Sequence, residues 1–91
     1  MSTGSLFPAP AQTLGVLACQ RNEFAYAGQL LQESARKRPL DPKGLYYLGK
    51  SLLAIKEMPE GKAALEKSLV AGLQEPFAAD AKKVLGELEK K

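Results

Sequence analysis

Few side chains in this sequence can carry out acid–base or nucleophilic chemistry. The 91 residues contain no histidine and one cysteine, Cys19. Nucleophilic catalysis generally needs a nucleophile beside a positioned base, which is most often histidine. A lone cysteine in a mostly apolar helical stretch is more often a small hydrophobe than a reactive thiol. The sequence therefore predicts a protein that is not an enzyme.

Residues suited to metal or cofactor binding are also scarce. Zinc sites draw on several cysteine and histidine ligands, and one cysteine supplies neither a ligand set nor an internal disulfide. We do not expect Gly15 or Gly49 to form a phosphate-binding loop, because no strand is expected before either glycine. We expect no metal and no cofactor.

Two adjacent tyrosines, Tyr46 and Tyr47, are the most informative polar side chains. Neighbouring residues on a helix point in different directions, so both rings cannot enter one core. We expect one of them to face outward, where a tyrosine can contact a partner through its apolar body and its hydroxyl.

The charged residues are mixed along most of the chain. Thirteen basic and ten acidic residues give a net charge of +3. The densest basic cluster is Arg36, Lys37 and Arg38, at the expected last turn of a helix, where cations favour the negative end of the dipole. A nucleic-acid or anionic-surface site would need a broader basic face. We expect no nucleic-acid partner, and such a surface stays open only as the third alternative below.

The composition is typical of one soluble globular domain, with 45% hydrophobic and 25% charged residues. No apolar run approaches the roughly 18 to 20 residues that a helix needs to cross a bilayer. Residues 1–10 lack the basic start and apolar block of a secretory signal. We expect a cytoplasmic protein without a membrane partner.

The sequence superposes on itself when it is shifted by about 34 residues, which aligns Leu14 with Leu48. The other matched identities are Gly15 and Gly49, Glu23 and Glu57, Leu31 and Leu65, Ser34 and Ser68, and Pro42 and Pro76. A fixed period of about 20 to 50 residues indicates a repeat architecture. We call this shift the repeat period, and each unit is predicted to be one helical hairpin.

Prolines and turn residues predict where the helices begin and end. Proline is tolerated in the first turn of a helix but not further in. Asp41 is a good N-cap for a helix that starts at Pro42, and Asn22 and Gly72 tolerate the left-handed backbone of a helix end. The proline starts are Pro10, Pro42, Pro59 and Pro76. The expected helices span about 10–21, 23–38, 42–56, 59–71 and 76–90.

Glycine within a helix costs about 1 kcal/mol relative to alanine, so Gly15 and Gly49 need a compensating reason. Close packing against small residues on the second helix, Ala27 and Gly61, provides one. The last expected helix is amphipathic and can cap the stack. Its apolar residues are Phe77, Ala81, Val84, Leu85 and Leu88, and those expected to face water are Asp80, Lys82, Lys83, Glu87 and Glu89.

The stretch from about 8 to 71 resembles two consecutive tetratricopeptide repeats. The first matches the family pattern at Leu14, Gly15, Phe24, Ala27, Leu31, Ser34 and Pro39, and the second at Leu45, Leu48, Gly49, Leu52, Gly61, Leu65 and Ser68. The sequence departs from the family pattern at Ala18, which replaces a large aromatic residue, and at Leu73, where a proline normally ends the repeat, and Gly61 is a small residue in place of the usual alanine. The resemblance implies an all-α fragment of a helical solenoid, with about five antiparallel helices. It divides the chain into a flexible segment (1–8) and one domain (9–91) with repeats at about 8–41 and 42–75 and a capping helix at about 76–90.

In such repeats the first helix of each hairpin lines a concave groove. The resemblance assigns to this groove Gln12, Val16, Cys19 and Gln20 from the first repeat and Lys43, Tyr46, Lys50 and Leu53 from the second. This mixture suits an extended or helical peptide, with Tyr46 as the anchor and the lysines orienting the ligand. The full lysine and asparagine set with which some members clamp a C-terminal carboxylate is absent.

Three hypotheses for function follow. The first is a protein–protein interaction module or scaffold that holds a partner in the groove. The alternative is a structural unit that self-associates into a homo-oligomer. The third is a binder of anionic surfaces or nucleic acid, whose affinity should fall steeply with added salt.

Overall fold

The computed structural model describes residues 11–89, and every regular element in this range is an α-helix. The helices are α2 (Ala11–Gln20), α3 (Phe24–Lys37), α4 (Pro42–Ala54), α5 (Met58–Val70) and α6 (Phe77–Glu89). This confirms the predicted all-α fold, and the described helix ends agree closely with the predicted ones. The predicted flexible segment 1–8, the helix start at Pro10 and the helix end at 90 lie outside the described residues.

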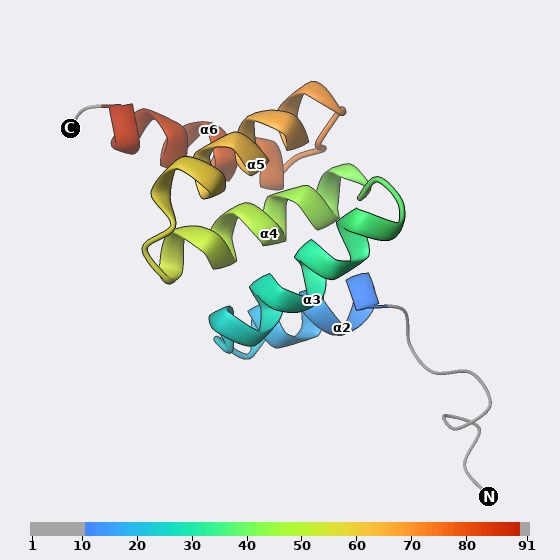
Figure 1. The fold of residues 1–91 in the computed structure, drawn as a ribbon. Coiled ribbons are helices and arrows are strands. Elements are labelled where there is room, and N and C mark those ends of the chain that lie inside the picture. Colours follow the sequence, from blue (N-terminus) through green and yellow to red (C-terminus); the bar gives the residue numbers. More distant parts are fainter. Residues whose placement is uncertain (1–10, 90–91) are drawn as a thin grey trace, which may run out of the picture.

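The helices stack in chain order (Figure 1). The hairpin of α2 and α3 forms one end, α4 lies in the middle, and α5 and α6 form the other end. Each helix packs on the next, and α4 also contacts both α2 and α6. Among the described helices, α3 and α5 make no comparable contact with each other. The helices α2, α4 and α6 therefore form one continuous layer.

The two hairpins are closed by the same close contact. A Cβ atom added at Gly15 would lie 2.6 Å from Leu31 Cγ, and one added at Gly49 would lie 2.7 Å from Leu65 Cγ. Real Cβ atoms do not approach other carbons this closely, so a side chain at either position would displace the facing leucine. The prediction that these glycines allow close helix packing is confirmed, and the repeat period is visible in the packing itself.

The turns inside the two hairpins are also equivalent. Asn22 and Lys56 have left-handed backbones, with φ of 64° and 72°. After them, the Glu23 N–H donates to the Ala18 carbonyl at 2.9 Å and the Glu57 N–H donates to the Leu52 carbonyl at 2.8 Å. This hydrogen-bond pattern satisfies carbonyls that the helix end leaves free.

The predicted helix-end signals have the expected geometry. Asn22 and Gly72 both have positive φ, 64° and 99°. Asp41 caps α4 because its Oδ1 accepts a hydrogen bond from the Gly44 N–H at 2.7 Å. The left-handed conformation of Lys56 was not predicted, since lysine gives no local signal for it.

The last helix closes the stack through its apolar face. Ala81 is fully buried with Leu65 of α5, and the residues of α6 that pack around them are Phe77, Val84 and Leu85. Asp80, which was expected to face water, is half-buried. Its carboxylate is turned toward α4, where it accepts hydrogen bonds from Tyr46 and Lys50.

Candidate binding face

Three aromatic rings pack together where α4 meets α6. The ring centroids of Tyr46 and Tyr47 lie 5.1 Å apart, those of Tyr46 and Phe77 5.3 Å, and those of Tyr47 and Phe77 6.1 Å. Tilted and edge-on pairs at such separations are favourable beyond the apolar area that they bury. This aromatic cluster fixes the start of α6 against the middle of α4.

A polar contact lies beside the aromatic cluster. The Tyr46 hydroxyl donates to Asp80 Oδ2 at 2.5 Å, and Lys50 Nζ lies 3.0 Å from the same oxygen. The hydrogen bonds from Tyr46 and from Lys50 hold the pKa of Asp80 below its usual value. Burial and the Asp80 carboxylate together raise the pKa of Tyr46, so its hydroxyl stays protonated as a donor. The three groups therefore form a charge-assisted link between α4 and α6.

Two lysines flank the aromatic cluster. Lys43 Nζ lies 5.2 Å from the centroid of the Phe77 ring, and Lys50 Nζ lies 5.8 Å from that of Tyr46. Both distances are within the range of cation–π attraction. Lys43 is exposed, and no carboxylate of the described residues forms an ion pair with it. Of these two ammonium groups, that of Lys43 is the one free to meet a ligand.

The layer continues from α4 to α2 through Gln20. Its side-chain amide nitrogen lies 3.5 Å from the Tyr47 hydroxyl, at the long limit for a hydrogen bond. Gln20 is exposed and Tyr47 is half-buried. We call the surface formed by Gln20, Lys43, Tyr47, Lys50, Phe77 and Asp80 the layer face.

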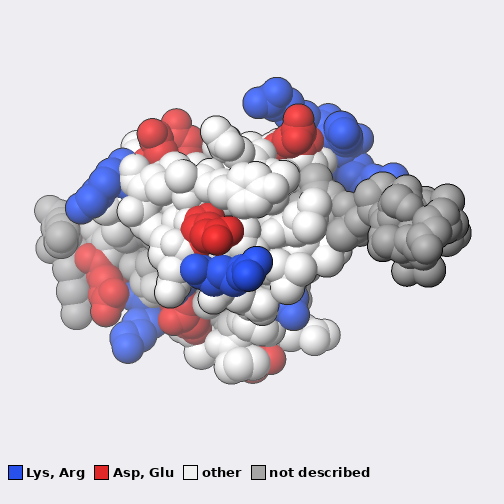
Figure 2. Space-filling view, turned by 90° about the horizontal axis from the view of Figure 1, so that it is seen from below, with Lys and Arg blue, Asp and Glu red and all other residues white. Residues whose placement is uncertain are grey.

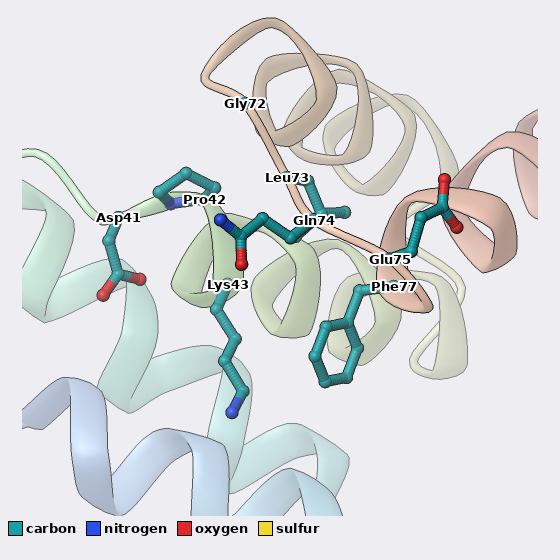
Figure 3. Close-up of a pocket in the computed structure, with 8 residues that line it drawn as sticks. All are labelled: Asp41, Pro42, Lys43, Gly72, Leu73, Gln74, Glu75 and Phe77. Atoms are coloured by element: carbon teal, nitrogen blue, oxygen red, sulfur yellow. The ribbon is translucent and has the colours of Figure 1, made fainter.

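A pocket of about 360 Å³ adjoins one end of the layer face (Figure 3). It is bounded by the turn before α4 and by the segment that joins α5 to α6. Its lining residues are Asp41, Pro42, Lys43, Gly72, Leu73, Gln74, Glu75 and Phe77. The Lys43 side chain and the Phe77 ring extend in the same direction at its edge, so it offers an ammonium group beside an apolar wall.

The eight residues assigned to the groove have different surroundings. Gln20 and Lys43 are exposed and Lys50 is half-buried. Tyr46 is 7% exposed and Cys19 also 7%, with Cys19 Sγ 3.9 Å from the Tyr47 carbonyl oxygen. The side chain of Gln12 lies outside the described residues.

The two aliphatic residues of that set lie half-buried between helices. Val16 packs on the Leu31 core cluster, and Leu53 fills the space that a side chain at Gly61 would need. That these eight residues bind a ligand stays a prediction. The expectation that one tyrosine faces outward holds only for part of the Tyr47 surface, because α6 covers the rings.

Sequence reasoning missed Asp80 and Phe77 as members of the layer face. Asp80 follows Tyr46 by one repeat period and so occupies the same register position in α6 that Tyr46 occupies in α4. Phe77 stands in the same relation to Lys43. The repeat period was therefore the signal that could have placed both residues beside α4.

One spacing in α4 imitates a nucleotide-binding motif. Gly44, Gly49, Lys50 and Ser51 have the spacing of a phosphate-binding loop, which requires a strand before it and free backbone amides. All four residues lie inside a regular helix, and Ser51 is 0% exposed. Lys50 is bound to Asp80. This segment therefore has no cradle for a phosphate.

Residues 11–89 contain no group of three or more histidine, cysteine, aspartate or glutamate side chains that could hold a metal ion. No helix within this range is long and apolar enough to cross a membrane.

The fold and the layer face define an all-α stack of two equivalent helical hairpins and a closing helix. Comparison with protein-family models, with curated proteins and with solved structures found no match.

Proposed function

We propose that this chain is a tetratricopeptide-type interaction module that binds a protein or peptide along the layer face. The repeat geometry supports the family assignment. Both hairpins have a glycine against a leucine of the partner helix and a left-handed residue at the turn, and each pair is separated by one repeat period. A recurrence of this kind in helix–turn–helix units is the signature of these repeats.

The arrangement of helices supports the layer face as the binding surface. The middle helix α4 touches both α2 and α6, while α3 and α5 do not touch each other. A stack whose elements meet on one side and separate on the other curves toward the side that meets. The inner side of such a curve is the one that surrounds an extended ligand.

The observation that carries the proposal is the exposed ammonium group of Lys43 beside Phe77 and the pocket. It combines a charge for orientation with apolar surface for affinity, as peptide-binding sites do. The preferred ligand is a peptide with an acidic side chain next to an apolar one. In this arrangement Tyr46 and Lys50 act through Asp80, by holding α6 in place, while Lys43 contacts the ligand.

The test begins with peptides selected against the protein from a random library displayed on phage. Affinities of the selected peptides are then measured for the wild type, for Lys43→Glu and for the control Lys67→Glu. Lys67 is exposed near the end of α5, away from the layer face. Both variants replace a lysine by a glutamate, so they change the net charge equally. We expect Lys43→Glu to weaken binding by at least about tenfold and Lys67→Glu to leave it nearly unchanged.

Two results would contradict the proposal. Equal losses from the two variants would indicate attraction to net charge instead of a site. Selected peptides that bind Lys43→Glu as well as wild type would place the binding surface elsewhere. Circular dichroism of both variants checks that they retain the helical fold.

A further inference from the structure

The end of the stack formed by α2 and α3 exposes large apolar side chains. Leu14 is 39% exposed, Leu17 49% and Tyr26 52%, and Leu30 is half-buried. Figure 2 views the molecule from this end. Uncharged surface fills most of the view, a red and a blue area adjoin near its middle, and the other charges lie toward the rim. We call the exposed side of α2 that carries Leu14 and Leu17 the end face.

The internal repeat shows what covers the equivalent face of the second hairpin. Leu48 and Ser51 stand one repeat period after Leu14 and Leu17 and are 7% and 0% exposed. They are covered by α3, whose Leu31 shares a core cluster with Leu48 and whose Gly28 faces Ser51. A Cβ atom added at Gly28 would lie 3.9 Å from Ser51 Cβ. A helix with a small residue and a leucine on one face thus covers the α4 version of the end face.

From this equivalence we infer that the end face docks an amphipathic helix of another protein, with the contact chemistry that α3 presents to α4. The contact side of this helix carries a small residue and, three positions later, an aliphatic one. Leu17 stands where α4 has Ser51 and extends further from the helix, so the residue opposite it must be small. This site shares no residue with the layer face and does not depend on the function proposed there.

A second copy of this chain does not fit the same requirement. In this chain Gly28 and Leu31 of α3 form the needed contact side, whereas α5 has Lys62 at the position of the small residue. Leu31 of α3 packs with α4, and Leu65 of α5 packs with Ala81 of α6. A second copy would therefore have to open its own core before α3 could reach the end face of another molecule.

A peptide with the sequence of residues 23–38 is a direct probe, because it contains all of α3. Glu33 and Lys37 are four residues apart and exposed, so a side-chain amide between them holds the peptide helical without changing the contact side. The peptide is titrated into the whole chain, and methyl resonances of Leu14 and Leu17 are followed by NMR. We expect saturable shifts at both residues.

Matched substitutions give the discriminating results. Leu17→Glu in the protein should weaken the peptide by at least about tenfold, because docking would bury an unpaired carboxylate. Val70→Glu, at a residue that is 89% exposed on α5, makes a similar apolar-to-acidic change and should leave binding intact. Leu31→Glu in the peptide should abolish the shifts. If Leu17→Glu lowers helicity, Leu14→Gln replaces it in the same comparison.

Several outcomes would overturn the inference. The first is that the peptide causes no saturable shifts in the wild type. The second is that Leu17→Glu and Val70→Glu weaken peptide binding equally, and the third is that both variants bind the peptide as well as wild type. A wild-type dimer that Leu17→Glu dissociates in sedimentation would make a second copy the occupant. Shifts at Leu14 and Leu17 caused by Leu6→Ser with Phe7→Ser, without added peptide, would make the chain's own N-terminal segment the occupant.

Discussion

Replacing Gly49 by alanine tests the close contact within the second hairpin. The substitution favours the helix by about 0.5–1 kcal/mol, because alanine loses less backbone entropy than glycine. The new Cβ would lie 2.7 Å from Leu65 Cγ and 3.0 Å from the Gly61 carbonyl oxygen. Overpacking of a fitted core costs about 1–3 kcal/mol, so the net effect runs from neutral to a loss of about 2.5 kcal/mol.

The matched control is Gly86→Ala in α6. A Cβ at this position would meet nothing within 4 Å, so only the gain of about 0.5–1 kcal/mol remains. Gly86→Ala should therefore be more stable than Gly49→Ala by about 1–3 kcal/mol, the overpacking cost alone.

The two hairpins also predict which glycine, Gly15 or Gly49, loses more stability when it is replaced by alanine. At Gly15 the added Cβ meets mainly the movable Leu31 side chain, with the Ala27 carbonyl oxygen 3.4 Å away. At Gly49 the nearest backbone oxygen is closer, at 3.0 Å, and backbone yields less easily than a side chain. Gly15→Ala should thus cost less than Gly49→Ala.

Urea unfolding followed by circular dichroism gives the free energies of all three variants. Thermal unfolding checks them, since 1 kcal/mol shifts the midpoint of a domain of this size by about 4–8 °C. If Gly49→Ala stabilises the protein as much as Gly86→Ala does, the close contact between α4 and α5 is refuted.

Three further predictions concern α4 and its partner residues. Tyr46→Phe should destabilise the fold by about 1–2 kcal/mol in urea unfolding, because the charged acceptor Asp80 loses its hydrogen bond from the hydroxyl; unchanged stability would contradict this contact. Ser51→Ala should leave stability unchanged or raise it by up to about 1 kcal/mol, since the buried Ser51 hydroxyl has no hydrogen-bond partner among the described residues; a clear loss would show that a partner exists. The depressed pKa of Asp80 means that its pairing stabilises the fold above the ordinary aspartate pKa and that this contribution disappears as the pH falls through the lower folded value. The stability advantage of wild type over Asp80→Asn should therefore be full at neutral pH and vanish in acid, and an advantage that persists in acid would exclude the charged form as its source.

The positions of the helices could be predicted because their signals are local. Asp41 before Pro42 and the left-handed tolerance of Asn22 and Gly72 each act within one turn of the chain. The left-handed backbone of Lys56 was missed because a lysine side chain does not favour this conformation, which the surrounding turn imposes. Its place one repeat period after Asn22 would have identified it.

The candidate site was harder to predict, because its members meet across helices. Periodicity alone assigned Asp80 to the water-facing side of α6, and nothing local indicates that its carboxylate accepts from Tyr46. The rings of Tyr46 and Tyr47 were expected to point in different directions, with one of them facing outward. In the structure both rings pack against Phe77 of α6. The helical context likewise decides against phosphate binding at Gly49 and Lys50, whose spacing alone would favour it.

The central claim is that the layer face binds peptides, and amide chemical-shift mapping tests it most directly. A peptide selected from the library is titrated into the isotope-labelled whole chain. We expect the largest shifts at Gln20, Lys43 and Phe77, on α2, α4 and α6, and we expect them to saturate together. Shifts concentrated on the outer sides of α3 and α5 would contradict it.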